Sequence, residues 1–214
     1  LAALAEGRGD DAPEKVLVGV NAELTGSIPV AGQSCRSAAD LAVKEVNALG
    51  GVEVAGKRVP VAIVVEDNED KAESAAAAAQ KLVSAGVLAM IGPNASRNAI
   101  PASEVAEAGK VPMISPWSTA QKLTVDARSN APKKYVFRTA FTDDFQGVVA
   151  ANFALAQLKT KKPAVLYDVA SEYNKGIAEV YGQTLVKKGI EIASFDTYTT
   201  GDKDFSAQLT KIQK

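Results

Sequence analysis

Residues 87–96 read VLAMIGPNAS, and residues 111–119 read VPMISPWST. Each stretch is a short apolar run that stops at a loop of small and hydroxyl-bearing residues. A segment with helical spacing lies between them, so the region predicts a strand, a helix and a second strand. In a parallel sheet both loops lie at the carboxyl ends of their strands, which is where open α/β sheets bind ligands.

These two loops predict a site for a small anion. The first loop leads into a helix predicted over residues 98–108, and the N-terminus of a helix favours negative charge. Ser96, Ser118 and Thr119 add hydroxyl groups, and we expect the backbone N–H groups of both loops to be free for a ligand. Such a site holds a small carboxylate without a metal ion or a histidine.

Predicted strands and helices alternate along the chain from Val16. This alternation is typical of a mainly parallel sheet with helices on both faces, so the predicted class is α/β, with Rossmann-like lobes. The first lobe is placed at residues 15–139. Its strands are predicted at residues 16–20, 59–66, 87–91, 111–114 and 135–139, and its helices at residues 34–48, 70–84 and 98–108.

A second lobe is predicted at residues 140–214, after a crossing near residues 138–142. Its helices are expected at residues 145–158, 172–188 and 204–212, and its strands at residues 164–167 and 190–195. Two strands are too few to bury both faces of a sheet, so the second lobe is expected to be incomplete. If the chain ends at Lys214, open strand edges favour a homodimer or strand exchange.

Composition disfavours several classes of function. A net charge of −1 gives no pull toward nucleic acid or an anionic membrane. The chain has no histidine, and its single cysteine, Cys35, has no partner for a disulfide or a thiolate metal site. We therefore expect no enzyme, no cofactor and no metal. Residues 1–14 are interpreted as a lead-in, either the end of a secretory signal or a disordered terminus.

Three motifs that suggest other chemistry have simpler interpretations. Residues 51–57 fit the spacing of a phosphate-binding loop, but Arg58 follows them where that motif requires Ser or Thr. A strand also follows them, so a hairpin turn is favoured. The acidic cluster at residues 66–70 and the pair at residues 143–144 each precede a helix, which predicts N-capping and stabilisation of the helix dipole. The serines of the loops have no histidine to activate them as nucleophiles.

Two aromatic residues are further candidates for a pocket. Trp117 follows Pro116 in the second loop, where a core position and a pocket wall are equally compatible with the sequence. Tyr173 follows the first clear strand of the second lobe, so it either faces the first lobe across a cleft or packs on its own helix.

Several motifs in order resemble those of the periplasmic solute-binding proteins of the leucine/isoleucine/valine-binding type, which have the type I periplasmic-binding fold. The most diagnostic is VPMISPWST at residues 111–119. The others are ELTGS (23–27), VNALGGV (46–52), EDN (66–68), IGP (91–93), PAS (101–103), FRT (137–139), QG (146–147) and GDKDFS (201–206). The match runs over almost the whole chain from Val16, and no single motif in it is specific.

The resemblance implies two hinged lobes that close on a small-molecule ligand, an amino acid or another carboxylate. It implies that Ser96 and Thr119 bind the carboxylate and that Tyr173 closes from the second lobe. It further implies a periplasmic location and an ABC permease in the membrane as partner, whereas a ligand-sensing domain of a receptor or of an amide- or urea-type regulator is the alternative. The expected ligand-binding set is Asn94, Ala95, Ser96, Trp117, Ser118, Thr119 and Tyr173.

Three positions depart from the family pattern. Trp117 is bulkier than the small residue usual at its place, Arg97 replaces a small polar residue beside Ser96, and Ala31 stands where some relatives have an aromatic residue. The resemblance also places the acidic residue that neutralises the ligand's amine beyond Lys214. The identity of the ligand therefore stays open.

Overall fold

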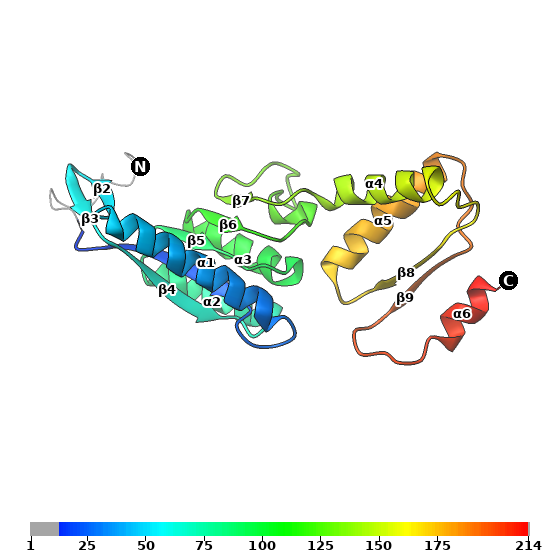
Figure 1. The fold of residues 1–214 in the computed structure, drawn as a ribbon, viewed down its shortest axis with the longest axis horizontal. Coiled ribbons are helices and arrows are strands. Elements are labelled where there is room, and N and C mark those ends of the chain that lie inside the picture. Colours follow the sequence, from blue (N-terminus) through cyan, green and yellow to red (C-terminus); the bar gives the residue numbers. More distant parts are fainter. Residues whose placement is uncertain (1–12, 214) are drawn as a thin grey trace.

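The computed structural model describes residues 13–213, and these form two lobes that lie end to end along the long axis of the molecule (Figure 1). The expected lead-in at residues 1–14 falls almost wholly outside the described residues. Within residues 13–213, no helix combines the length and the apolar composition that crossing a membrane requires.

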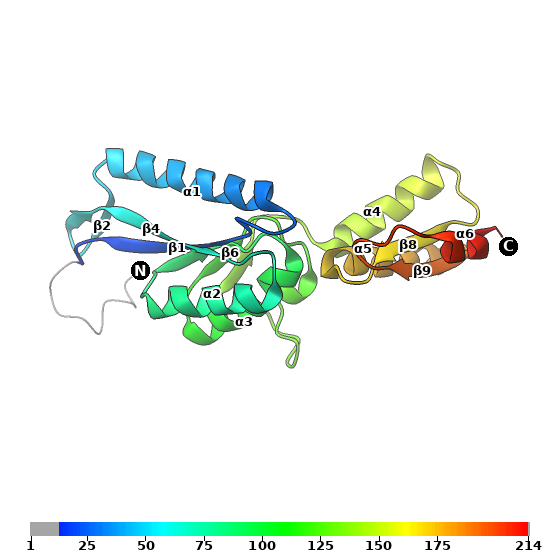
Figure 2. The same ribbon diagram turned by 90° about the horizontal axis from the view of Figure 1, so that it is seen from below.

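Lobe one is built on a parallel five-stranded sheet with the order β4-β1-β5-β6-β7. In the view of Figure 2, helix α1 covers one face of this sheet and α2 and α3 cover the other. The strands are β1 (Val16–Ala22), β4 (Val61–Asp67), β5 (Ala89–Ile91), β6 (Met113–Ser115) and β7 (Val136–Arg138). The helices are α1 (Pro29–Ala48), α2 (Ala72–Ser84), α3 (Ser96–Gly109) and the short 3₁₀ turn η2 (Gln121–Leu123).

The core of lobe one combines a few large side chains with many alanines. Leu82, Met90 and Met113 are fully buried between the sheet and the helices α2 and α3. Ala99, Ala102 and Ala106 line the buried face of α3, and small side chains at these positions let α3 lie close to α2 and to the sheet. This packing fixes α3, and with it the position of Ser96 at the first residue of the helix.

Lobe two contains the parallel strand pair β8 (Ala164–Asp168) and β9 (Ser194–Tyr198). Its helices are α4 (Asp143–Ala156), α5 (Glu172–Lys187) and α6 (Ser206–Ile212). Helices α4 and α5 approach closely at Gly147, where an added Cβ atom would lie 2.7 Å from the Val180 side chain. Large apolar side chains of lobe two, among them Phe153 and Phe195, remain exposed in the described residues.

The predicted boundary between the lobes stays a prediction, and the structure gives its local context. Strand β7 pairs with β6 in the first sheet, and α4, which follows it, packs on α5 in lobe two. The expected homodimer also stays a prediction.

The observed elements correct several of the predicted bounds. Helix α1 begins at Pro29 rather than at residue 34, because proline is well suited to the first turn of a helix. Strand β9 runs from Ser194 to Tyr198, four residues later than predicted at its start and three at its end. The hairpin interpretation of residues 51–57 is confirmed, since β2 (Val52–Val54) and β3 (Lys57–Val59) pair in antiparallel fashion.

The capping interpretation of the acidic residues is wrong. Neither α2 nor α4 receives a side-chain hydrogen bond at its N-cap. Instead, Asp67 accepts backbone N–H bonds from Leu24, Thr25 and Glu69, so it ties the end of β4 to the loop that follows β1. These hydrogen bonds lower the pKa of Asp67 and outweigh the opposing effect of burial. Glu73 of α2 and the acidic pair in the first turn of α4 lie where they favour the helix dipole.

Candidate ligand-binding site

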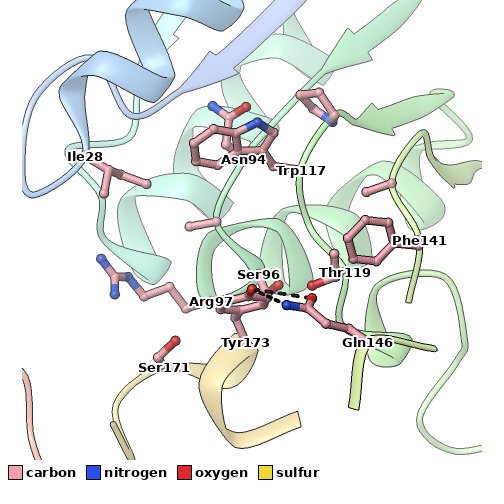
Figure 3. A pocket seen from close by; sticks show the side chains of 13 residues that line it. Ile28, Asn94, Ser96, Arg97, Trp117, Thr119, Phe141, Gln146, Ser171 and Tyr173 are labelled. Carbon is pink, nitrogen blue, oxygen red and sulfur yellow. Dashed lines mark hydrogen bonds between the residues drawn. The ribbon is translucent and has the colours of Figure 1, made fainter. Parts of the chain in front are cut away.

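A cavity of about 520 Å³ lies where lobe one meets lobe two. Figure 3 shows its lining side chains. They come from the loops after β1, β5 and β6, the segment between β7 and α4, and the starts of α3, α4 and α5. The lining consists of Ile28, Asn94, Ala95, Ser96, Arg97, Pro116, Trp117, Thr119, Ala140, Phe141, Gln146, Ser171 and Tyr173.

The cavity gathers all of the predicted site residues except Ser118. Ser118 is buried behind the wall, where its Oγ donates to Ser96 Oγ over 3.0 Å and its backbone N–H donates to Ser115 Oγ over 3.2 Å. These contacts link the loop after β6 to the loop after β5. Ser118 therefore supports the position of Ser96 rather than facing the cavity itself.

The expectation of free backbone N–H groups in the first loop is wrong for Asn94 and Ala95. The side chain of Glu23, which follows β1, is fully buried beneath that loop. Its Oε1 accepts the N–H of Ala95 at 3.0 Å, and its Oε2 accepts Asn94 Nδ2 at 2.7 Å. The N–H of Asn94 donates to both oxygens at 3.2 Å, and Asn98 Nδ2 donates to Oε1 at 3.0 Å. An internal carboxylate thus takes up the N–H groups of Asn94 and Ala95, the two residues that precede α3.

Thr119 places a hydroxyl group at the cavity. The residue is only 6% exposed, and its Oγ1 has no hydrogen-bond partner within the described residues. A buried hydroxyl without a partner costs free energy, and a polar ligand in the cavity would remove that cost. In Figure 3, Thr119 lies with Ser96, Gln146 and Tyr173 toward one end of the cavity, and Trp117 lies toward the other.

Asp143, the first residue of α4, lies close to Thr119. Its N–H donates to the carbonyl of Thr119 over 3.0 Å, and burial raises the pKa of its carboxyl group. The Thr119 hydroxyl and the Arg138 guanidinium oppose this rise in pKa. Neither the Thr119 hydroxyl nor Asp143 Oδ1 makes a hydrogen bond of normal geometry within the described residues.

This raised pKa predicts a pH dependence of stability. The folded protein holds the Asp143 proton more tightly than the unfolded chain does, and an aspartate in the unfolded chain has a pKa of about 3.9. The contribution of Asp143 to the free energy of unfolding therefore falls as the pH rises from that value through the pKa of Asp143 in the folded protein. We expect Asp143→Asn to gain stability relative to the wild type between about pH 4 and about pH 7, as measured by urea unfolding. Glu45→Gln, at an exposed position of α1, is the charge control. A relative stability of Asp143→Asn that falls over this range would contradict the assignment.

Lobe two contributes a polar pair that sequence reasoning found only in part. The hydroxyl of Tyr173 accepts a hydrogen bond from Gln146 Nε2 over 3.0 Å, so the predicted tyrosine is held at the cavity by a residue of α4. Gln146 belongs to one of the motifs that carry the family resemblance, and this motif was the only feature of the sequence that could have marked it as a site residue. Ile28, Phe141 and Ser171 also line the cavity, and no motif marks them.

Arg97 interacts with acidic residues of both lobes. Its guanidinium donates to Asp70 Oδ2 of lobe one, whose Oδ1 accepts Asn98 Nδ2 at 2.9 Å. In lobe two, hydrogen bonds from Thr200 lower the pKa of Asp168, and the positive charge of Arg97 adds to that lowering. Arg97 is therefore charge-balanced by acidic residues on both sides of the cavity.

The comparisons with known proteins agree with this geometry. The family model described as periplasmic binding protein matches residues 15–214. The chain belongs to the periplasmic binding protein family. It is 36% identical over 198 residues to the Leu/Ile/Val-binding protein BraC3 of Rhizobium johnstonii, which covers 92% of this chain and 51% of that relative. It is 32% identical over 203 residues to the leucine-, isoleucine-, valine-, threonine- and alanine-binding protein of Pseudomonas aeruginosa, covering 95% of this chain and 52% of the relative.

A solved structure supports the fold directly. The branched-chain amino acid transporter substrate-binding protein LivJ of Streptococcus pneumoniae, in complex with isoleucine, matches with a TM-score of 0.77 at 34% identity. The match covers 93% of this chain and 54% of that chain, so the chain spans about half the length of the relatives it matches. The α/β fold of periplasmic binding proteins with an incomplete second lobe is thus confirmed. The relatives are named for what they bind, which agrees with the expectation that the chain is not an enzyme.

Proposed function

We propose that this periplasmic binding protein chain captures a small carboxylate, with an amino acid as the first candidate, between its two lobes. The observation that carries the proposal is the buried Thr119 hydroxyl, which has no hydrogen-bond partner in the described part of the chain and lies with Ser96 on the wall of an open cavity between the lobes. A carboxylate accepts hydrogen bonds from such groups and needs them when it leaves water. The names of the relatives, which are branched-chain amino acid binders, support the same class of ligand.

Capture begins on lobe one and is completed by lobe two. Ser96 and Thr119 bind the carboxylate in the open form, and closure then brings Tyr173 and Gln146 over the ligand. The ligand stabilises the closed form because only that form contacts it on both sides. The closed form delivers the ligand to an ABC permease, and the protein works in the periplasm. A ligand-sensing role is less well supported, since LivJ is named as a transporter component.

The side chain of Trp117 limits the space in the cavity that is available to the rest of the ligand. Its side chain is 58% exposed and lies on the cavity wall, as does that of Phe141 at 57%. Both are therefore available to contact an apolar or aromatic group of the ligand. The ligand's side chain is expected to fit against this aromatic wall, so its preferred size can differ from that of the leucine binders.

Calorimetry of the full chain against a panel of amino acids and other small carboxylates tests the proposal. The best ligand is then measured against Ser96→Ala and Thr119→Val. Each variant is expected to bind about 10- to 100-fold more weakly, since each removes a donor to a buried charge worth about 1–3 kcal/mol. Ser84→Ala, at the exposed end of α2, is the matched control and should bind as the wild type does. Absence of binding to every carboxylate would reject the proposal.

A further inference from the structure

One arginine holds the loop that carries Trp117 and Thr119. We call residues 115–124 the pocket loop and residues 138–143, between β7 and the start of α4, the crossing segment. Arg138, at the end of β7, donates from one terminal nitrogen to the carbonyls of Ser118 and Ala120, at 3.3 and 2.8 Å. Its other terminal nitrogen donates to the carbonyl of Gln121 at 3.4 Å and to Thr124 Oγ1 at 2.6 Å.

Further bonds join the same two segments. Thr139 donates its N–H to the carbonyl of Ser115 and its Oγ1 to the carbonyl of Pro116, both over 3.2 Å. The N–H of Asp143 donates to the carbonyl of Thr119 over 3.0 Å. The carbonyl groups along the pocket loop are therefore held by the crossing segment. The side chains of Trp117 and Thr119 line the cavity.

The pocket loop depends on these bonds because it contains little regular structure of its own. After β6 ends at Ser115, its only helical element among the described residues is the single turn of η2. A guanidinium group suits this task, since its planar array of donors reaches several carbonyls at fixed angles. An ammonium group keeps the charge but lacks this planar array.

We propose that Arg138 is a positioning residue, which fixes the pocket loop to the crossing segment so that Trp117 and Thr119 are held at the cavity. Because the crossing segment leads into lobe two, the position of the ligand-contacting loop is then coupled to the orientation of the lobes. The role of Trp117 and Thr119 in ligand binding rests on the proposed function. The mechanical role of Arg138 does not.

Trp117 is the single tryptophan of the chain, so its fluorescence reports on the pocket loop without a label. The steady-state anisotropy of Trp117 is measured on the full chain without ligand, in the wild type, Arg138→Gln and Arg138→Lys. Both variants are expected to lower the anisotropy, because the loop moves more freely once the planar array of donors is lost. Circular dichroism verifies that each variant is folded. If Arg138→Gln does not fold, the same measurement is made on Thr124→Val, which removes only the hydrogen bond between Arg138 and Thr124 Oγ1.

Arg58→Gln is the matched control. Arg58 also donates to a backbone carbonyl, that of Gly51 at 2.7 Å, but it lies in the β2–β3 hairpin and does not line the cavity. This variant should leave the anisotropy of Trp117 unchanged. With the best ligand of the panel, Arg138→Gln should bind at least about 10-fold more weakly than Arg58→Gln.

The outcomes separate the two proposals. Wild-type anisotropy in Arg138→Gln, its full recovery in Arg138→Lys, or wild-type ligand affinity in Arg138→Gln would overturn the role of Arg138. If no ligand binds the wild-type chain, the proposed function fails, and the anisotropy still decides the role of Arg138.

Discussion

Replacing Glu23 by alanine is expected to lower the free energy of unfolding by about 3–5 kcal/mol. The carboxylate is fully buried and accepts hydrogen bonds from the backbone of Asn94 and Ala95 and from the side chains of Asn94 and Asn98. Its removal leaves several buried donors unsatisfied at once, and each unsatisfied group carries its own desolvation cost. Small domains have a total stability of only about 5–15 kcal/mol, so the loss would be a large part of the whole.

Urea unfolding followed by circular dichroism measures this loss. Glu23→Gln, which keeps the shape but replaces one acceptor by a donor, should lie between the wild type and Glu23→Ala. The control is Glu53→Ala on the exposed hairpin, where a change within about 0.5 kcal/mol is expected. If Glu23→Ala unfolded with the same free energy as Glu53→Ala, the carboxylate would not be supporting the loop after β5.

The second large effect is expected at Gly92, between β5 and the cavity. Its φ angle is +82°, and an added Cβ atom would lie 2.2 Å from the carbonyl oxygen of Asn21. Gly92→Ala therefore combines an unfavourable backbone conformation with a clash against the backbone of β1, which cannot move cheaply. Each effect costs about 1–3 kcal/mol, so we expect a loss of about 2–6 kcal/mol in the free energy of unfolding.

Gly56→Ala separates these two contributions. Gly56 has a similar φ angle of +77°, but nothing lies within 4 Å of the position of an added Cβ atom. Its replacement should show the backbone cost alone, about 1 kcal/mol in the same urea experiment. Equal losses at Gly92 and Gly56 would mean that the contact with Asn21 relaxes freely, which would contradict the prediction.

The site was predictable where its residues follow strands. Ser96, Trp117 and Thr119 come directly after apolar runs, and the carboxyl ends of parallel strands meet at the same edge of a sheet. The local sequence pattern was therefore enough to predict that the two loops lie side by side. Tyr173 follows the same rule in lobe two, and the structure places it at the same cavity.

The buried partners of these loops were not predictable in the same way. Glu23 lies more than seventy positions before Asn94 in the sequence, and no local pattern indicates that its carboxylate ends beneath the N-terminus of α3. The same holds for Ser118, which has the composition of a ligand-binding residue but points behind the cavity wall. Whether a side chain in an irregular loop points into the protein or toward the cavity depends on the surrounding fold rather than on the residue type.

The sequence alone determined the alternation of strands and helices, the edge of the sheet where the candidate cavity lies, and the family. These properties follow from short-range periodicity and from motifs that are read in order. The tertiary structure decided which polar groups are used internally and which remain free for a ligand. Glu23 satisfies the backbone N–H groups of Asn94 and Ala95, and Arg138 holds carbonyls of the pocket loop. Thr119 keeps a hydroxyl at the cavity that has no partner among residues 13–213. Hydrogen bonds of this kind join residues far apart in the chain, so only the folded geometry assigns them.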